Sequence, residues 1–162
     1  MKNKLFILFL TATILSACNN DIIYEKTQDI NNARWHKDSV VGLQFKPELE
    51  QSYDLYFLLR NDNNYPYSNI FLIASIEDEK ITSVDTLEYE MATPEGKWLG
   101  NGIWDLKESK LIYKTNYKFS DTLTKTFSIR QAVRKTGKVK GDSILKGIVS
   151  VGIVIEKHQQ QQ

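Results

Sequence analysis

Short runs of alternating apolar and polar residues, separated by turn residues, recur along most of this chain. The clearest run covers residues 53–60, where aromatic and aliphatic residues stand at every odd position. Side chains of a strand alternate between two faces, so this run predicts a strand with one buried face. Further runs of strand length lie over residues 40–45, 70–77, 81–91, 110–119, 124–134 and 144–157. No segment of about ten or more residues carries the apolar stripe of an amphipathic helix. The chain is therefore expected to fold as one all-β domain, an antiparallel β-sandwich or jelly roll.

Turn residues mark where the backbone between these runs takes special conformations. The Asn-rich segment 61–69 is expected to be a loop, and its Tyr65–Pro66 bond is a candidate cis peptide. Residues 70–77 are almost continuously apolar, which is typical of a central strand. Gly147 and Gly152 interrupt the last run and predict a bulge or a close approach between strands. The polar residues 25–34 are expected to form a connection or a single helical turn.

Residues 1–18 have the pattern of an export and lipidation signal. Two lysines precede an almost wholly apolar run, residues 5–15. This run is too short to span a bilayer, for which about 20 apolar residues are needed. It ends in the tetrapeptide LSAC at residues 15–18, which resembles the lipobox of bacterial lipoproteins. In that family the chain is cut before the cysteine, whose thiol accepts a diacylglycerol.

A plain signal peptide that ends near a cysteine by chance is the alternative, but Cys18 is the only cysteine in the chain. We therefore expect a lipid on Cys18 that holds the protein at a membrane. Two or three acyl chains anchor a protein stably, because each buried methylene contributes about 0.8 kcal/mol. The expected division is residues 1–17 as signal peptide, 18–34 as lipidated cysteine with N-terminal spacer and first extended segment, 35–157 as β-sandwich, and 158–162 as disordered tail.

Charge and composition exclude several classes of function. Lys and Arg number 21 against 20 Asp and Glu, so the net charge of +1 lacks the basic excess of nucleic-acid-binding proteins. A single cysteine excludes an internal disulfide. With only two histidines in addition, a structural zinc site lacks ligands.

No arrangement of catalytic residues stands out in the sequence. Glu88 and Glu90 share one face of an expected strand, as paired carboxylates of a glycosidase could, but a solvated strand face explains them more simply. The side-chain oxygens of Asp62, Asn63 and Asn64 could hold calcium, although an Asx-rich turn without metal is the commoner role. We therefore expect no enzyme activity, no catalytic residue, no cofactor and no metal site.

Aromatic residues in two loops are the strongest candidates for binding. Trp98 and Trp104 stand around two glycines, and Tyr65 and Tyr67 form a second pair. Such rings stack on sugars or anchor protein interfaces, but for the two tryptophans capping of the core is the favoured role. Because interfaces are enriched in arginine and aromatic residues, the predicted partner-binding residues are Arg60, Tyr65, Tyr67 and Trp98.

Several blocks after Cys18 resemble the gliding-motility lipoprotein family GldH of the Bacteroidota. The blocks are WHKD at residues 35–38, LRN at 59–61, YPYSN at 65–69, GKWLG at 96–100, QAVR at 131–134, LKGI at 145–148 and VGI at 151–153. They keep their order over nearly the whole mature chain, and none is a catalytic motif. The chain departs from the family at Ile103-Trp104, where a small residue is expected, and at Val133, where methionine is frequent.

The resemblance implies an envelope lipoprotein that gliding motility requires and that is linked to the type IX secretion apparatus. It implies no enzyme activity and no cofactor. The expected role is that of a docking or assembly factor whose partners are envelope proteins of this machinery. The alternative is a glycan- or peptidoglycan-binding module that uses the same aromatic residues. Asn19, Asn20 and the single Asp21 form no acidic cluster of the kind associated with surface display, which favours an outer-membrane anchor with a periplasmic domain.

Overall fold

The computed structural model describes residues 21–78, 81–133 and 142–159, and in these ranges the backbone is mostly extended. Sheet I has the strand order β1 (Ile22–Asp29), β10 (Ile148–Lys157), β4 (Ser52–Asn61), β7 (Lys107–Lys118). Sheet II has the order β3 (Val41–Phe45), β8 (Lys125–Gln131), β5 (Asn69–Asp78), β6 (Ile81–Glu90). A short ribbon pairs β2 (Arg34–His36) with β9 (Ile144–Lys146), and a 3-10 turn, η2 (Asn31–Ala33), precedes it.

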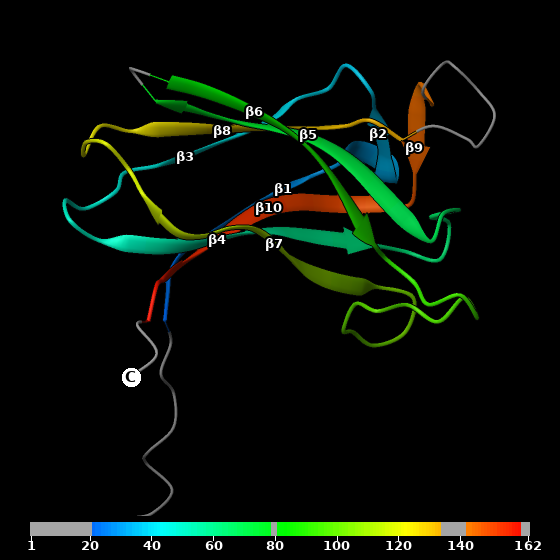
Figure 1. The fold of residues 1–162 in the computed structure, drawn as a ribbon. Coiled ribbons are helices and arrows are strands. Elements are labelled where there is room, and N and C mark those ends of the chain that lie inside the picture. The colour runs from blue at the N-terminus through cyan, green and yellow to red at the C-terminus, as the bar shows by residue number, and fades with distance from the viewer. Residues whose placement is uncertain (1–20, 79–80, 134–141, 160–162) are drawn as a thin grey trace, which may run out of the picture.

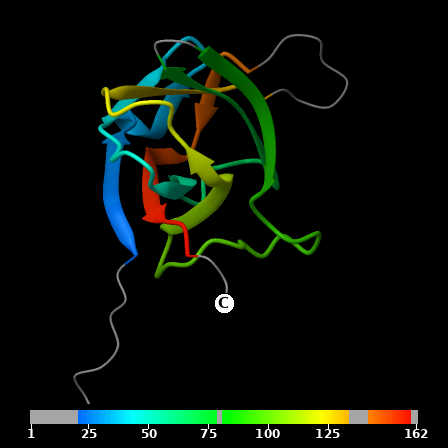
Figure 2. The same ribbon diagram turned by 60° about the vertical axis from the view of Figure 1, so that its left-hand side comes forward.

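The named pairs are all antiparallel, and the two sheets lie one above the other (Figure 1, Figure 2). The expected β-sandwich is confirmed.

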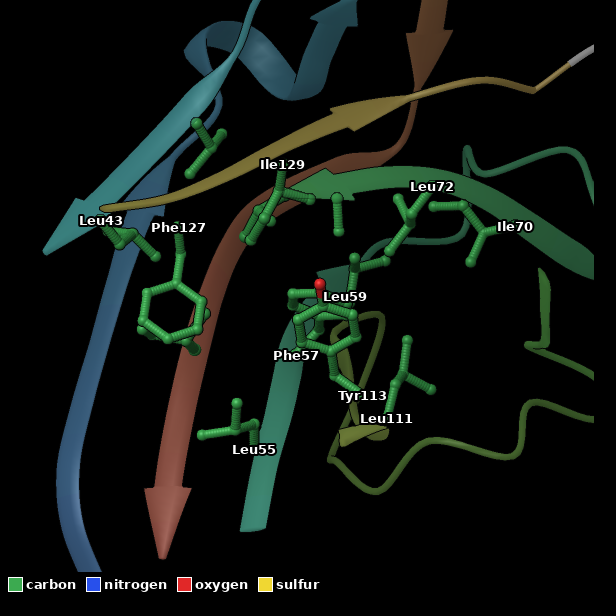
Figure 3. Packing of buried hydrophobic residues seen from close by; sticks show 14 of the residues in the cluster. Leu43, Leu55, Phe57, Leu59, Ile70, Leu72, Leu111, Tyr113, Phe127 and Ile129 are labelled. Carbon is green, nitrogen blue, oxygen red and sulfur yellow. The ribbon is translucent and has the colours of Figure 1, made fainter. Parts of the chain in front are cut away.

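The hydrophobic core lies between the two sheets, where every second residue of the central strands points inward. On β4 the buried set includes Leu55, Phe57 and Leu59, and Figure 3 shows them opposite Leu72 and Phe127 of sheet II. This is the face that the alternation over residues 53–60 predicted. Because burial of such side chains contributes about 1.5–3 kcal/mol each, the core is the main source of stability.

Two details of the last expected strand follow from its glycines. Gly147, with a φ of +81°, separates β9 from β10, and a register shift follows between Ile148 and Ser150. Gly152 lies inside β10, where a β-carbon would come within 2.4 Å of the Lys26 carbonyl oxygen on β1. The expected close approach of strands is therefore confirmed. The Tyr65–Pro66 peptide, a candidate cis bond, is trans.

The structure differs from the expected division of the chain at both ends of the sandwich. Residues 22–29 lie within 18–34, which was expected to hold a spacer and a first extended segment outside the sandwich; they form the edge strand β1, which pairs with β10. The sandwich therefore begins at Ile22, before the expected boundary at residue 35. Its polar sequence suits an edge strand, because most of its side chains face solvent. His158, expected in the disordered tail, bonds through its Nδ1 to Asp54 at 2.9 Å, so the ordered chain extends past Lys157.

The two ends of the sandwich are distinct. The terminal end carries Asp21 and residues 157–159, which lie side by side: the Lys157 amide donates to the Asp21 carbonyl at 3.0 Å (Figure 1). The loop end carries η2, loop 61–69, loop 91–106 and the residues Val133 and Asp142, which are joined by a backbone hydrogen bond of 2.8 Å. Since β4 and β10 each have 10 residues, the two ends lie about 30 Å apart. The expected signal peptide and Cys18 lie outside the described residues, which contain no helix long and apolar enough to cross a bilayer.

Candidate functional site

Loop 61–69 is fixed against the β9–β10 junction at the loop end. The Asp62 amide donates to the Gly147 carbonyl at 2.9 Å, and the Gly147 amide donates to Ala33 at 2.8 Å. A β-carbon on Gly147 would lie 2.2 Å from the Tyr65 amide nitrogen. Only glycine therefore allows the loop to approach this closely, and this contact sets the position of Tyr65.

Tyr65 is the centre of an aromatic cluster. Its ring lies 5.9 Å from Tyr67 in an edge-on arrangement and 6.2 Å from Trp98. Tyr65 is only 3% exposed, and its hydroxyl donates to the Asn69 carbonyl at 2.7 Å. Burial raises the pKa of Tyr65, and the neighbouring Tyr67 raises it further. The sequence placed Tyr65 on a binding surface; the structure places it in the core, where it supports the two rings beside it.

Tyr67 is partly buried and is held by Asp142, which precedes β9. Its hydroxyl donates to the Asp142 carboxylate. Burial of the hydroxyl has the larger effect and the bond to Asp142 the smaller, and together they raise the pKa of Tyr67 to about 12. Gln131, which is 1% exposed, holds Asp142 and Val133 in place by donating to the Asp142 carbonyl and accepting from the Val133 backbone amide, both at 2.9 Å. Tyr67 therefore has a set orientation at the protein surface.

A cleft of about 600 Å³ opens beside Tyr67. It is lined by Asn64, Pro66, Tyr67, Asp142, Ile144, Leu145 and Lys146. An aromatic ring, an amide, a carboxylate and an ammonium group thus surround one hollow. This mixture of groups can both stack on a sugar ring and form hydrogen bonds with its hydroxyls.

The tryptophans of loop 91–106 have different environments. Trp98 packs partly buried against the core, and its indole nitrogen lies 3.4 Å from the Asn63 side-chain oxygen. This agrees with the expectation that it caps the core. Trp104 is 89% exposed, so the same expectation is wrong for it.

Arg60 stands apart from the aromatic cluster. It lies on the outer face of sheet I, where its Nε is 2.6 Å from a Glu108 carboxylate oxygen. Both side chains are more than a third exposed, and such pairs contribute about 0–1 kcal/mol. Of the four predicted binding residues, the structure brings together Tyr65, Tyr67 and Trp98.

The other chemical candidates form no site in the described part of the chain. Glu88 and Glu90 are exposed on the outer face of β6, and a Glu88 carboxylate oxygen accepts from the Asn69 side-chain amide at 2.6 Å. Asp62 accepts from the Asn64 backbone amide at 2.8 Å, which is the Asx turn expected there. Among the described residues, no three His, Cys, Asp or Glu side chains are grouped closely enough to hold a metal ion.

The sequence matches the family model of the GldH lipoproteins over residues 22–155. A gliding motility lipoprotein GldH of Flavobacterium johnsoniae is 45% identical over 93% of this chain and 94% of that protein. A gliding motility lipoprotein GldH homolog of Christiangramia forsetii is 44% identical over 95% of each. The matched region begins at the first residue of β1.

A solved structure aligns weakly with the sandwich. The crystal structure of the VP2 subviral particle of infectious bursal disease virus aligns with 82% of this chain and covers 30% of the viral chain. The sequence identity is 16% and the TM-score is 0.30. A similarity of this size carries no argument about function.

Proposed function

The chain belongs to the GldH lipoprotein family, and on this premise we propose that it is a lipid-anchored envelope protein that gliding motility requires, acting as a non-enzymatic docking or assembly factor. The observation that carries the proposal is the identity of 44–45% to two gliding-motility lipoproteins over nearly the full chain. Its partners are envelope proteins of the gliding and type IX secretion machinery, as the resemblance implies.

The position of the anchor relative to the loops supports a docking role. With a lipid on Cys18, the first described residue, Asp21, lies at most about 11 Å of extended chain from the anchored cysteine. The terminal end is then held close to the membrane, and the loop end faces away from it. Loops on a rigid sandwich commonly carry the residues that bind partners. Arg60, Tyr67 and Trp98 are proposed as contact residues near this end, with Tyr65 as the buried support of the latter two.

We place the anchor in the outer membrane and the domain in the periplasm. Asn19, Asn20 and Asp21 follow the cysteine without a cluster of acidic residues. A periplasmic domain can reach membrane-bound and soluble envelope proteins alike. Fractionation of the envelope, followed by protease treatment of intact cells, tests this placement: digestion of the domain from outside would contradict it.

Deletion of the gene and complementation test the role in motility. We expect the deletion to abolish gliding and the wild-type chain to restore it. Cys18→Ala should fail to restore gliding because the protein loses its lipid. In-cell crosslinking of the tagged lipoprotein should recover gliding or secretion components, and the Cys18→Ala chain should not. Normal gliding of the deletion strain would contradict the proposal.

The cleft beside Tyr67 favours a second candidate function, a glycan-binding module. Its lining combines the Tyr67 ring with Asn64, Asp142 and Lys146. Titration of the purified protein with muropeptides released from peptidoglycan tests this candidate, with intrinsic fluorescence and calorimetry as readouts. Saturable binding that Tyr67→Ala removes would support it. Absence of binding at millimolar muropeptide would leave docking on proteins as the function.

A further inference from the structure

The ribbon of β2 and β9, side by side in Figure 1, leaves one edge of β9 without a strand partner in the described part of the chain. At both ends of β9 the backbone bonds run toward β2. The Ser143 carbonyl accepts at 3.0 Å from the residue after β2, and the Gly147 amide donates at 2.8 Å to the residue before it. In a trans peptide the N–H points opposite to the carbonyl that precedes it. The Ile144 N–H and the Lys146 carbonyl therefore point away from β2.

The remaining backbone groups of Ile144 and Lys146 lie on the same edge. Leu145 between them is paired with Trp35 of β2, and successive residues of a strand face opposite edges. Among the described residues, no backbone bond reaches Ile144 or Lys146 from that edge. The free groups repeat at every second residue, about 7 Å apart, which is the spacing of another extended chain.

The cleft beside Tyr67 runs along this free edge. It is lined by three consecutive residues, Ile144, Leu145 and Lys146, although the Leu145 side chain is 1% exposed and belongs to the core. Alternate side chains of a strand point to opposite faces, so a hollow that touches consecutive residues lies along the edge. Pro66 and Tyr67 line the same cleft from loop 61–69.

The lateral seams of the sandwich differ from this edge, because a tyrosine bridges each of them. The Tyr24 hydroxyl of β1 donates to the Gln44 carbonyl of β3 at 2.6 Å. On the other side, the Tyr89 hydroxyl of β6 donates to the Ile112 carbonyl of β7 at 2.7 Å. Such bridges obstruct the addition of a further strand, and natural sheets commonly block their edges in some way. No bridge of this kind crosses the β9 edge within the described residues.

Two cations beside the cleft lack an acidic partner. Arg34 on β2 and Lys146 on β9 stand directly opposite each other, and both are exposed. The Lys and Arg ion pairs of the described residues involve other cations. Like charges in directly opposite positions destabilise a pair of strands. An acidic group that binds between the two side chains would remove this repulsion.

The carboxylates nearby are already held by hydrogen bonds. Asp142 accepts from a tyrosine hydroxyl of the cleft, and Asp62 accepts from the Asn64 backbone amide at 2.8 Å. A second hollow of about 250 Å³ includes Arg34 and Asp62 in its lining and shares Asn64 and Lys146 with the cleft. An acidic side chain from a ligand in the cleft can therefore reach both cations.

We propose that an extended, acidic segment of another envelope protein binds in this cleft as an added strand along the free edge of β9. Its backbone bonds to Ile144 and Lys146, and an acidic side chain lies between Arg34 and Lys146. Tyr67, which Asp142 holds in place, packs against the segment. In strand addition the backbone bonds provide affinity and the alternate side chains provide specificity. The inference rests on the docking role proposed above and names the chemistry of the partner.

Site-specific photo-crosslinking of the full lipoprotein in its own cells is the first test. A benzophenone amino acid replaces Ile144 in one strain and Val84 in a control strain. Ile144 is 40% exposed and lines the cleft, whereas Val84 is 64% exposed on the edge strand β6. We expect position 144 to give one discrete protein adduct that position 84 lacks. Mass spectrometry should find Asp or Glu in the crosslinked segment.

Titration of the purified lipoprotein with a synthetic peptide of the crosslinked segment tests the mode of binding. Hydrogen exchange at the Ile144 and Lys146 amides should slow at least about tenfold, because the peptide bonds to them. The Gly147 amide is already bonded within the protein and should change little. Contacts through side chains alone would leave the two N–H groups of β9 free to exchange.

Ile144→Pro removes the N–H that faces the cleft and keeps the pairing of Leu145 with β2. Proline is tolerated on an edge strand where its nitrogen faces away from the ladder. We expect this variant to bind the peptide at least about tenfold more weakly than the wild type. Ile144→Ala loses the same side chain but keeps the N–H, so it should bind more tightly than Ile144→Pro. Should Ile144→Pro fail to fold, amide protection in the wild type decides the mode.

Reversal of the two charges tests the place of the acidic side chain. The double variant Arg34→Glu with Lys146→Glu should bind the peptide at least about tenfold more weakly, because it repels the acidic residue. Binding by the wild type should weaken as salt is added. Equal affinity of the double variant and the wild type would remove the acidic contact from the inference.

Several results would overturn the inference. An adduct at position 144 with a second copy, with lipid or with glycan strands would assign the cleft to that occupant. Absence of an adduct specific to position 144 would show that no protein segment binds there. Peptide binding without protection of the Ile144 and Lys146 amides, or equally weak binding by Ile144→Pro and Ile144→Ala, would exclude strand addition.

Deletion of the gene separates this inference from the proposed role in motility. If the deletion strain glides normally while the adduct and the amide protection persist, the role in motility fails and the strand-addition site stands. If the deletion abolishes gliding but position 144 gives no adduct, the role in motility stands and this inference fails.

Discussion

The Tyr113 hydroxyl donates to an Asp85 carboxylate oxygen over 2.8 Å and so joins the two sheets along the seam between β7 and β6. The Tyr113 ring is stacked on Phe57 at 4.6 Å, inside the core. The Lys114 ammonium lies 2.9 Å from the same Asp85 oxygen. The seam thus combines a core ring with a charge-assisted hydrogen bond, and β7 and β6, as described, share no backbone pairing.

Tyr113→Phe should lower the free energy of unfolding by about 1–2 kcal/mol. The ring can remain stacked on Phe57, and the bond to the charged Asp85 acceptor is lost. Urea denaturation of the purified protein measures the change. An unchanged unfolding midpoint would mean that the bond adds nothing to stability.

Asp85 should make the fold sensitive to acid. Hydrogen bonds from Lys114, which has the larger effect, and from Tyr113 hold the pKa of Asp85 below its usual value. A lowered pKa in the folded state adds stability above the unfolded pKa of about 3.9, and this stability is lost as the pH falls through the folded value. Asp85→Asn should therefore be less stable than the wild type at neutral pH but should lose less stability between about pH 5 and pH 2. Urea denaturation at a series of pH values measures the unfolding free energy of both proteins. Curves of this free energy against pH that run parallel would contradict this assignment.

The strands could be predicted from the sequence because each central strand buries one face, which leaves an alternating pattern. Residues 53–60 and 70–77 lie inside their sheets as β4 and β5. An extended segment was expected within residues 18–34, but its place in the sandwich was missed because β1 is an edge strand with one pairing partner, β10, and mostly exposed side chains. From residue 25 onward its sequence is polar and resembles that of a loop, and the strand forms because the far end of the chain supplies its partner.

The binding residues were harder to predict than the strands. Tyr65 and Tyr67 occupy one Asn-rich loop, and nothing local separates a buried tyrosine from a partly exposed one. The difference arises from Gly147, which lets Tyr65 enter the core, and from Asp142, which holds Tyr67 at the surface. The exposure of Trp104 could have been suspected from the sequence, because the GldH family resemblance leads one to expect a small residue at this position.

Tyr65→Ala should be a folding variant rather than a binding variant. Removal of a ring that is 3% exposed and contacts both Tyr67 and Trp98 should cost about 3–5 kcal/mol. Tyr67→Ala should cost less, because its ring is only partly buried. Thermal unfolding of the two variants measures the difference. Equal losses would mean that the two tyrosines share one environment.

A pair of glycine variants should show how β1 is held beside the anchor. Gly152→Ala should destabilise the protein by about 1–3 kcal/mol, because the added carbon would meet the Lys26 carbonyl oxygen at 2.4 Å. Gly42→Ala in β3 is the matched control, with nothing within 4 Å of the added carbon, and should stabilise by about 0.5–1 kcal/mol.

Hydrogen exchange separates a local from a global effect: in Gly152→Ala the β1 amides around Lys26 should exchange faster than those of β5. Because β1 leads directly to the proposed lipid, a loosened strand would let the domain move away from the membrane without losing its anchor. Gly152→Ala with wild-type protection of β1 would show that the two strands can separate enough to admit a methyl group.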